Sequence, residues 1–324
     1  MDKASFIATC NAWASKGRPF LFIIDYEMEH FHILSAEDAA DQGIYYALRG
    51  NTNTAALKAK LPGNYYFTME PVSFESYEKA FSLVMKHIMY GDTFLLNLTF
   101  PTQLETDLSL EQIFLASRAS YRLLYKDQFV VFSPESFVRI ADDRIYSYPM
   151  KGTIDASLPD AENVLLENEK EKREHVTIVD LIRNDLSMVA SDVKVNRFRY
   201  IDHLRTNRSE LLQVSSEISG NLARHWRTAL GEILLKILPA GSISGAPKVK
   251  TMEIIREAEG QERGYFTGIF GVFDGVNLDS GVMIRYIEQV GGGLRFRSGG
   301  GITGSSEVRK EYKEMIDKVY VPIV

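Results

Sequence analysis

The sequence has little of what marks secreted and membrane proteins. It contains one cysteine, Cys10, so no disulfide can form within the 324-residue chain, and a disulfide-stapled secreted scaffold is excluded. No apolar run approaches the roughly 20 residues that a membrane-spanning helix needs. The segment after Met1 lacks the long apolar stretch of a secretory signal. We therefore expect a cytoplasmic globular protein that does not act at a membrane.

A large excess of charge of one sign is also missing. Lys and Arg number 37 and Asp and Glu number 43, which gives a formal net charge of −6. A mildly acidic balance favours solubility and argues against nucleic-acid binding, which needs a basic face. The hydrophobic fraction of 45% is that of an ordinary globular protein.

The chain has no internal repeat, no low-complexity tract and no Pro/Gly/Ser-rich linker, so a single domain over 1–324 is expected. Residues 1–60 alternate short apolar runs with polar stretches and predict strands and turns. Apolar spacing predicts helices over 73–90, 167–189, 229–238, 247–259 and about 307–319. Strands are predicted over 93–100, 129–132, 137–141, 267–273, 280–289 and 294–298. Many strands and a few irregularly placed helices indicate the α+β class.

Two of the predicted helices carry acids three residues apart. Glu171 and Glu174 lie on one, and Glu311 and Glu314 lie on the other. Residues at this spacing share a helix face. If the two faces met, the four carboxylates would repel one another unless a cation or protons neutralised them. Oxygen ligands without Cys or His suit Mg²⁺. Taken alone, the spacing is common and more often marks a solvated helix face.

Two reactive side chains stand beside turns. Lys151 precedes Gly152 and Thr153, and its amine becomes a nucleophile if burial near another cation lowers its pKa. Glu135 ends a Ser-Pro-Glu turn, where a carboxyl with a raised pKa serves as a general acid. The ordinary alternatives are a surface lysine before a turn and a turn carboxylate in water.

Glycine-rich segments and one arginine complete the candidates. The Gly-Ser-Ile-Ser-Gly-Ala-Pro-Lys segment at 241–248 opens a predicted helix, where free N–H groups attract anions. It is not a P-loop, so a carboxylate would fit as well as phosphate, and plain turn chemistry is the alternative. A triple glycine at 299–301 follows the strand predicted over 294–298. Arg285 stands inside an apolar strand and needs a carboxylate, from a ligand or from an internal ion pair.

Together these segments resemble the chorismate-utilising enzymes, a family that includes anthranilate, isochorismate, salicylate and aminodeoxychorismate synthases. The resemblance covers about 75–322, with 1–72 as variable N-terminal strands. It rests on six segments in the family's order: Ser-Pro-Glu at 133–135, Pro-Met-Lys-Gly-Thr at 149–153, Ile-Val-Asp-Leu-Ile-Arg-Asn-Asp-Leu at 178–186, 241–248, Tyr-Phe-Thr-Gly at 265–268 and Glu-Tyr-Lys-Glu at 311–314. One segment would be weak evidence, whereas six in order are specific. The family's fold is two large antiparallel sheets packed as a sandwich with outer helices.

The residue before Gly152 separates the branches of the family. Aminodeoxychorismate synthase component I carries lysine there, as this chain does with Lys151, whereas the other branches usually carry alanine. The enzymes that add water use a different lysine as base, and that position here reads Leu95. The resemblance therefore implies amination of chorismate at C4. Anthranilate synthase component I is the alternative, and a non-catalytic regulatory paralogue is less favoured.

The resemblance also implies a mechanism. Mg²⁺ would be held by Glu174 and Glu311, with Glu171 and Glu314 helping, and would bind the ring carboxylate of chorismate. Lys151 would attack C2 while the C4 hydroxyl leaves with a proton from Glu135. Ammonia would then enter at C4 and expel the lysine, so two displacements would replace one difficult substitution.

Further residues are implied to bind the substrate. The enolpyruvyl carboxylate would be held by Arg285, Tyr265 and the amides of the triple glycine. The full implied set is Arg285, Tyr265, Gly152, Thr153, Ser244, Gln213, Gly299, Gly300 and Gly301.

Two departures from the family pattern and one missing motif shape the expected reaction. Gln213 stands where many members have a histidine, so no acid is available there. No tryptophan-binding segment is recognisable in the N-terminal region, so no tryptophan feedback is expected. Cys10 lacks the glycine-rich setting of a glutaminase nucleophile. Ammonia is therefore expected from a glutaminase partner or from solution, and the product would be 4-amino-4-deoxychorismate, a precursor of p-aminobenzoate and folate.

Overall fold

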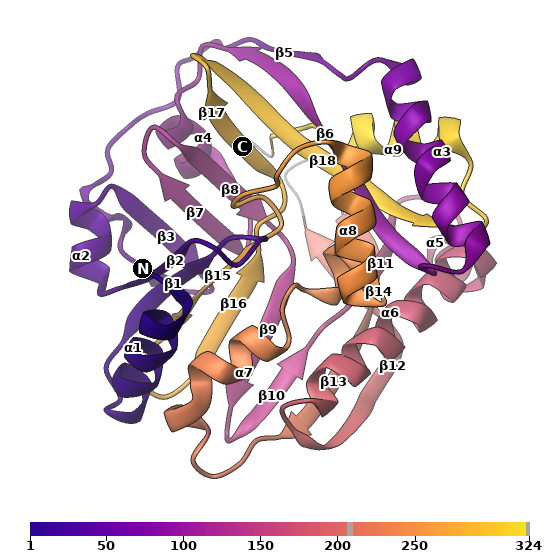
Figure 1. Cartoon of the computed structure of the whole chain (residues 1–324). Coiled ribbons are helices and arrows are strands. Elements are labelled where there is room, and N and C mark those ends of the chain that lie inside the picture. The colour runs from indigo at the N-terminus through magenta and orange to yellow at the C-terminus, as the bar shows by residue number, and fades with distance from the viewer. Residues whose placement is uncertain (206–209, 322–324) are drawn as a thin grey trace.

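The computed structural model describes residues 1–205 and 210–321, which form two nine-stranded sheets with helices packed around them (Figure 1). The first sheet has the order β11-β13-β10-β9-β16-β15-β1-β2, with β12 beside β13. The second has the order β14-β6-β18-β17-β8-β7-β3-β4, with β5 beside β6. Strand pairings in the described chain are antiparallel. The predicted α+β class and paired antiparallel sheets are confirmed.

The strands of the two sheets are interleaved along the chain. The first sheet contains β1 Phe20–Ile24, β2 Phe31–Leu34, β9 Ser136–Ala141, β10 Arg144–Ser147, β11 Met150–Asp155, β12 Ser191–Arg205, β13 Glu210–Asn221, β15 Ile269–Phe273 and β16 Leu278–Val282. The second contains β3 Ile44–Leu48, β4 Asn51–Thr52, β5 Phe67–Glu70, β6 Leu95–Thr106, β7 Tyr121–Tyr125, β8 Phe129–Ser133, β14 Gly245–Ala246, β17 Tyr286–Val290 and β18 Gly293–Thr303.

The α-helices lie outside the sheets (Figure 1). They are α1 Lys3–Ser15, α2 Ala36–Asp41, α3 Phe74–Tyr90, α4 Leu110–Ala116, α5 Ala161–Glu167, α6 Glu169–Ser187, α7 Leu230–Lys236, α8 Lys248–Glu259 and α9 Val308–Asp317. The described residues also form three 3₁₀ turns that connect elements, η1 Thr54–Ala56, η2 Trp226–Ala229 and η3 Gly241–Ile243. None of the helices in the described parts of the chain is long and apolar enough to cross a membrane.

Local sequence explains where the predicted helices begin and end. The Ser73 hydroxyl accepts a hydrogen bond from the Ser76 N–H at the start of α3, and Gly91 ends that helix at φ 90°. Pro247 precedes α8, where its missing N–H costs nothing, and Gly260 ends it at φ 64°. The predicted boundaries are therefore close to those observed.

The core lies between the sheets and beneath the helices. All five residues of β1 are buried, and they alternate between two clusters. Phe20, Phe22 and Ile24 pack under α1, α6 and α7, whereas Leu21 and Ile23 pack between the two sheets. The run of five apolar residues reflects this two-sided burial.

The N-terminal region differs from its prediction of strands and turns alone. Residues 3–15 form α1, whose buried side chains Phe6, Cys10 and Ala14 recur every fourth residue. This helical spacing was present in the sequence, but the neighbouring strand patterns masked it. The strands that follow are integral to the fold, because β1 pairs with β15 and β3 pairs with β7.

The chain passes from one sheet to the other at two neighbouring places. β8 of the second sheet leads through Pro134 and Glu135 into β9 of the first, and β16 of the first leads into β17 of the second. The crossings are joined by the Val282 N–H, which donates to the Glu135 carbonyl, and the Phe132 N–H, which donates to the Arg285 carbonyl, both at 3.1 Å. Glu135 and Arg285 therefore lie at the same junction of the two sheets.

The second crossing corrects the single strand predicted over 280–289. The chain ends β16 at Val282 and starts β17 at Tyr286, and Arg285 between them has φ 53°. A non-glycine residue at positive φ interrupts an extended strand. Arg285 is therefore a junction residue and not the interior strand residue that the apolar pattern suggested.

Candidate active site

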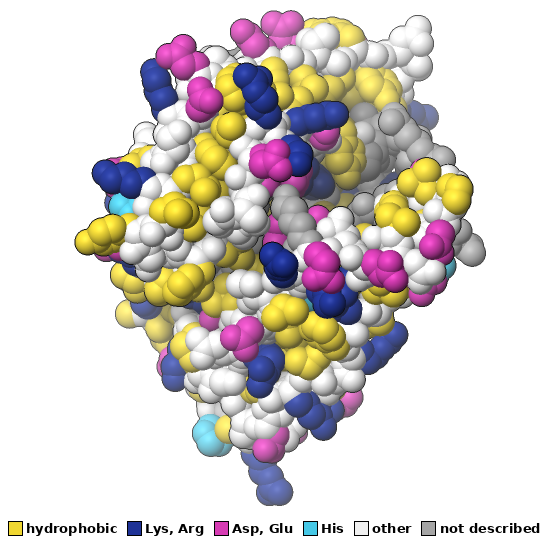
Figure 2. Space-filling model, turned by 90° about the vertical axis from the view of Figure 1, so that its right-hand side faces the viewer, with side chains coloured by type: hydrophobic (Ala, Val, Ile, Leu, Met, Phe, Trp, Pro, Cys, Tyr) yellow, Lys and Arg dark blue, Asp and Glu magenta, His cyan; other side chains and the backbone are white. Residues whose placement is uncertain are grey.

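A cavity of about 800 Å³ opens where the sheet junction meets α6 and α9. Figure 2 looks onto the side of the molecule that carries these helices, where acidic and basic side chains are interspersed over a hollowed surface. Walls of the cavity come from β11, β18, the two crossings and the 3₁₀ turn η3.

Most of the predicted site residues line this one cavity. They are Lys151, Glu135, Arg285, Gly152, Gln213, Gly299, Gly300, Gly301, Glu171, Glu174, Glu311 and Glu314. They come from segments spread over more than half of the chain, and the fold brings them together.

Two predicted substrate-binding residues lie elsewhere. The Tyr265 hydroxyl is 2.8 Å from Nε2 of His32, behind the cavity wall that Phe266 and Thr267 form. Ser244 is buried and its hydroxyl donates to the Ala240 carbonyl at 2.9 Å. The side chain of Thr153 lies outside the described part of the structure. In these two segments Phe266 and Ser242 line the cavity, whereas Tyr265 and Ser244 do not.

Lys151 lies on β11 between α6 and the strand that carries the triple glycine. Its Nζ is 3.6 Å from Oε2 of Glu174, and a Cβ placed on Gly301 would lie 3.7 Å from that Nζ. The Lys151 side chain keeps 24% of its surface exposed. The amine is thus held in the cavity by one moderately close carboxylate and remains accessible to a substrate.

Gly152 is required by its position beside Lys151. Its φ is +70°, and the register of β11 against β13 shifts between residues 151 and 153. A Cβ there would come within 2.9 Å of Leu165 and 3.4 Å of Oε2 of Glu171. Glycine therefore permits both the backbone turn and the close approach of the acidic helix.

Glu135 has an environment suited to a carboxylic acid. It accepts a hydrogen bond of 2.5 Å from the Ser242 hydroxyl. Burial raises the pKa of the Glu135 carboxyl above its usual range, partly offset by the Ser242 hydrogen bond and by the nearby cations Lys151, Arg285 and Lys318. A raised pKa keeps the carboxyl protonated closer to neutral pH, as a proton donor requires.

The triple glycine is part of a strand and not of a turn after it. Gly299, Gly300 and Gly301 continue β18 and pair with Thr99, Leu98 and Asn97 of β6. In the described chain β17 pairs with the opposite edge of β18 only as far as Arg297, so the glycines border the cavity. A Cβ on Gly299 would clash with the Leu98 carbonyl oxygen, and one on Gly300 would lie 3.3 Å from Oε1 of Glu314.

The four acids form two pairs on facing walls. Glu171 and Glu174 come from α6, and Glu311 and Glu314 from α9. A Cβ on Gly300 would lie 3.7 Å from Oε2 of Glu311, whose residue is only 2% exposed. Among the described residues, no three His, Cys, Asp or Glu side chains lie close enough to share one metal ion.

These acids nevertheless have the chemistry of a hard-cation site. Four carboxylates without a thiolate or imidazole match the all-oxygen ligands of Mg²⁺, which keeps waters and needs only one or two direct carboxylates. In the structure each pair has a lysine partner, since Lys151 lies by Glu174 and Lys318 donates to Glu314 at 2.7 Å. The donor set fits Mg²⁺ in kind, and one ammonium group lies beside one acid of each pair.

Lys318 is the main residue that sequence reasoning missed. Its Nζ donates to the Gly299 carbonyl at 2.8 Å as well as to Glu314, and burial lowers the pKa of its ammonium group. It lies one helical turn after Glu314, so the i,i+4 spacing was available as a signal. Ser242 was also missed, because nothing in the sequence distinguishes it from Ser244.

Tyr320 lines the cavity beside Lys318 and Arg285, with its ring centroid 5.1 Å from the Arg285 guanidinium carbon.

Comparison with known proteins agrees with this geometry. A family model described as chorismate binding enzyme matches residues 34–323. A Haemophilus influenzae protein described as an uncharacterized PabA-like protein is 53% identical over 318 residues, covering 98% of this chain and 96% of its own. Aminodeoxychorismate synthase component 1 of Bacillus subtilis is 33% identical over 266 residues, covering 77% of this chain and 55% of its own length. The chain thus spans about half of that relative.

The fold is shared with solved structures. The menaquinone-specific isochorismate synthase of Escherichia coli superposes with a TM-score of 0.73 at 17% identity, covering 97% of this chain and 80% of that one. At such low identity the match concerns the arrangement of sheets and helices alone. With the family match over most of its length and the predicted motifs gathered around one cavity, the chain belongs to the chorismate binding enzyme family.

Proposed function

We propose that the chain is component I of an aminodeoxychorismate synthase, which replaces the C4 hydroxyl of chorismate with an amino group. The observation that carries the proposal is Lys151, whose amine lies in the same cavity as the Glu135 carboxyl. A nucleophile and a proton donor facing one substrate-sized space are the two groups that a covalent displacement needs.

Leu95 supports amination over hydration. It is 5% exposed at the start of β6, and a Cβ on Gly301 would lie 3.2 Å from its Cδ1. Water-adding members of the family use a lysine at this position, by the resemblance described above. An apolar side chain there cannot remove a proton from water. The amine near Leu95 is that of Lys151, which acts as a nucleophile in the proposed reaction.

The proposed reaction has two displacements. The Lys151 amine forms a bond to C2, the two ring double bonds shift toward C4, and the C4–O bond breaks. Glu135 gives its proton to the departing hydroxyl, which leaves as water. Ammonia then forms a bond to C4, the double bonds shift back, and the C2–N bond to Lys151 breaks. The Glu135 carboxylate takes up a proton from the new ammonium group. The product is 4-amino-4-deoxychorismate, and Lys151 and Glu135 return to their starting states.

Electrostatics would orient the substrate. Chorismate carries two carboxylates, and Arg285 and Lys318 are cations on the cavity wall beside the glycine strand. Arg285 and the backbone of 299–301 would hold the enolpyruvyl carboxylate. Mg²⁺, held by Glu174 and Glu311 with help from Glu171 and Glu314, would neutralise the acids and bind the ring carboxylate.

The source of ammonia completes the proposal. The chain's one cysteine, Cys10, is buried under α7. Burial raises the pKa of its thiol well above the usual range, so the thiol is not suited to act as a thiolate nucleophile. Ammonia is therefore expected from a glutaminase subunit, or from solution when ammonium is abundant.

A product assay tests the proposal directly. The purified chain is incubated with chorismate, Mg²⁺ and excess ammonium at mildly alkaline pH, and products are identified by mass and by treatment with an aminodeoxychorismate lyase. Release of p-aminobenzoate supports amination at C4. Fluorescent anthranilate instead would assign the chain to the alternative, anthranilate synthase component I. Chorismate left intact, even with a glutaminase subunit present, would favour the non-catalytic paralogue.

A further inference from the structure

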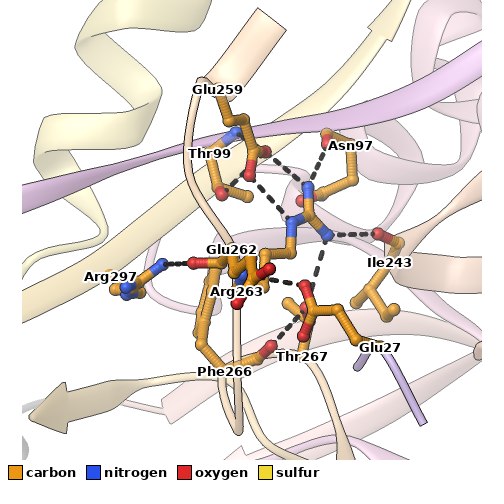
Figure 3. Close-up of polar contacts among 10 residues, drawn as sticks. All are labelled: Glu27, Asn97, Thr99, Ile243, Glu259, Glu262, Arg263, Phe266, Thr267 and Arg297. Atoms are coloured by element: carbon orange, nitrogen blue, oxygen red, sulfur yellow. Dashed lines mark hydrogen bonds and ion pairs between the residues drawn. The ribbon is translucent and has the colours of Figure 1, made fainter. Parts of the chain in front are cut away.

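Arg263 is a fully buried arginine that does not line the cavity but contacts three segments of its wall (Figure 3). It is 1% exposed, and each of its five N–H groups has an acceptor. The acceptors outside its ion pair are the Asn97 carbonyl at 2.6 Å, the Ile243 carbonyl at 2.9 Å and the Thr267 hydroxyl at 3.3 Å. Asn97, Ile243 and Thr267 all border the cavity.

The partner of this guanidinium is Glu259 at the end of α8. The carboxylate accepts from Arg263 Nη2 at 2.6 Å and Nε at 3.0 Å, and also from the Thr99 N–H at 2.9 Å. Glu27 holds the backbone of the same segment by accepting from the N–H groups of Arg263 and Gly264 at 2.9 Å each. Both charges of the pair therefore have hydrogen-bond partners, which a buried ion pair requires.

The side chains of this ion pair bind backbone groups of β6 beyond the point where its pairing with β14 stops. β14 pairs with β6 only at residues 95 and 96, so the next backbone groups on that edge need other partners. Arg263 takes the Asn97 carbonyl and Glu259 takes the Thr99 N–H. The opposite edge of β6 pairs with Gly299, Gly300 and Gly301, which we call the glycine wall. The Arg263–Glu259 pair therefore fixes the strand that holds the glycine wall in place.

The same guanidinium holds the turn that reaches Glu135. Ile243, whose carbonyl it binds, directly follows Ser242, and Ser242 donates its hydroxyl hydrogen bond to Glu135. Lys248 secures the other end of this segment by donating to the Ile237 carbonyl and pairing with Asp185 of α6, both at 2.8 Å. Displacing Ile243 would therefore move Ser242 relative to the carboxyl.

We propose that Arg263 is a positioning residue of the active cavity, which acts through Ser242 on Glu135 and through β6 on the glycine wall. The inference rests on the proposed function for the role of Glu135 as proton donor. A planar guanidinium can bind one carboxylate and three further acceptors at fixed angles, whereas a lysine ammonium has three donors on a flexible stem. Charge alone at position 263 would therefore not preserve the geometry.

The first experiment compares Arg263→Lys with Arg256→Lys. Arg256 lies on α8, the helix that carries Glu259, and it also pairs with a glutamate, Glu262, but both side chains are exposed. We expect kcat to fall about 10- to 100-fold for Arg263→Lys with KM within about threefold, because small misplacements of catalytic groups cost rate. Arg256→Lys should match the parent. Assays are run at a temperature where circular dichroism shows each variant folded.

The second experiment removes the hydroxyl that links the turn to Glu135. Groups facing that carboxyl are the Ser242 hydroxyl and the cations Lys151, Arg285 and Lys318, with Asp185 across a small cavity behind it. The donated hydrogen bond favours the ionised carboxylate, so Ser242→Ala should shift the alkaline limb of kcat to higher pH and lower kcat about tenfold. Ser242→Thr keeps a hydroxyl and should restore both quantities.

The outcomes separate this inference from the proposed function. Variants are compared with the parent on whichever product the parent forms, so a parent that makes anthranilate overturns the proposed function and leaves the Arg263 comparison intact. A folded Arg263→Lys with the parent's kcat and pH profile would overturn the inference. An unchanged pH limb in Ser242→Ala would likewise show that the turn does not act on Glu135.

Discussion

Two ion pairs near the cavity show opposite ways of using a buried charge. Arg263 and Glu259 approach to 2.6 Å, with side chains 1% and 0% exposed, and hydrogen bonds account for every guanidinium N–H. Lys151 and Glu174 lie 3.6 Å apart, with side chains 24% and 11% exposed. The first pair is closed and satisfied, whereas the second is looser and borders open space.

The difference follows from what each pair has to do. A fully desolvated pair is tolerated only with near-ideal geometry, and removal of one partner leaves an uncompensated charge. Such a pair fixes backbone segments. Under the proposed function the Lys151 amine would have to leave its carboxylate to reach a substrate, and a longer, partly exposed contact suits that role.

Loss of the reactive amine should have the largest effect. Lys151→Ala is expected to lower C4 amination at least about a thousandfold and to abolish the covalent adduct, because the variant lacks the amine that would form the bond to C2. Product formation and intact-protein mass after quenching measure both. Lys250→Ala, which removes an exposed lysine on α8, is the matched control. Parent-like amination by Lys151→Ala would refute the nucleophile assignment.

Breaking the closed pair should chiefly destabilise the fold. Glu259→Gln keeps the shape but leaves the Arg263 charge buried without a counter-ion, and we expect the free energy of unfolding to fall by about 3–5 kcal/mol. Denaturant unfolding followed by circular dichroism measures the change. A loss below about 1 kcal/mol would mean that the pair contributes no more than a surface contact.

Breaking the open pair should affect the metal requirement more than the fold. Glu174→Gln is expected to raise the Mg²⁺ concentration for half-maximal activity by about 10- to 100-fold. The free energy of unfolding should change by less than about 1 kcal/mol, because water can solvate the remaining lysine. Titration with MgCl₂ after chelation gives the first quantity. If activity in the parent survives complete chelation, the magnesium proposal is wrong.

The smallest effect is expected at the exposed counterpart of the closed pair. Glu262→Gln removes the partner of Arg256, where the two side chains are 76% and 64% exposed and 3.3 Å apart. We expect the free energy of unfolding to change by no more than about 0.5 kcal/mol, since exposed pairs are hydrated and screened by salt. A loss comparable to that of Glu259→Gln would show that burial does not distinguish the two pairs.

Sequence reasoning found what is encoded locally. The helices around Glu171 and Glu311 follow from apolar spacing, and both were predicted within a few residues. Lys151 and Glu135 were selected by motifs, and both line the cavity. The break in the strand at Arg285 was missed, because an apolar run has the same pattern whether it stays in one sheet or crosses to another.

The sequence by itself determined the family, the α+β class and the residue types available for chemistry, because short-range patterns and ordered motifs carry that information. Only the tertiary structure decided which neighbour in a motif faces the cavity, Ser242 instead of Ser244 and Phe266 instead of Tyr265. It also revealed Arg263, whose acceptors at 97, 243 and 267 are far apart in sequence. Hydrogen bonds between distant segments depend on how the sheets pack, and no local pattern records them.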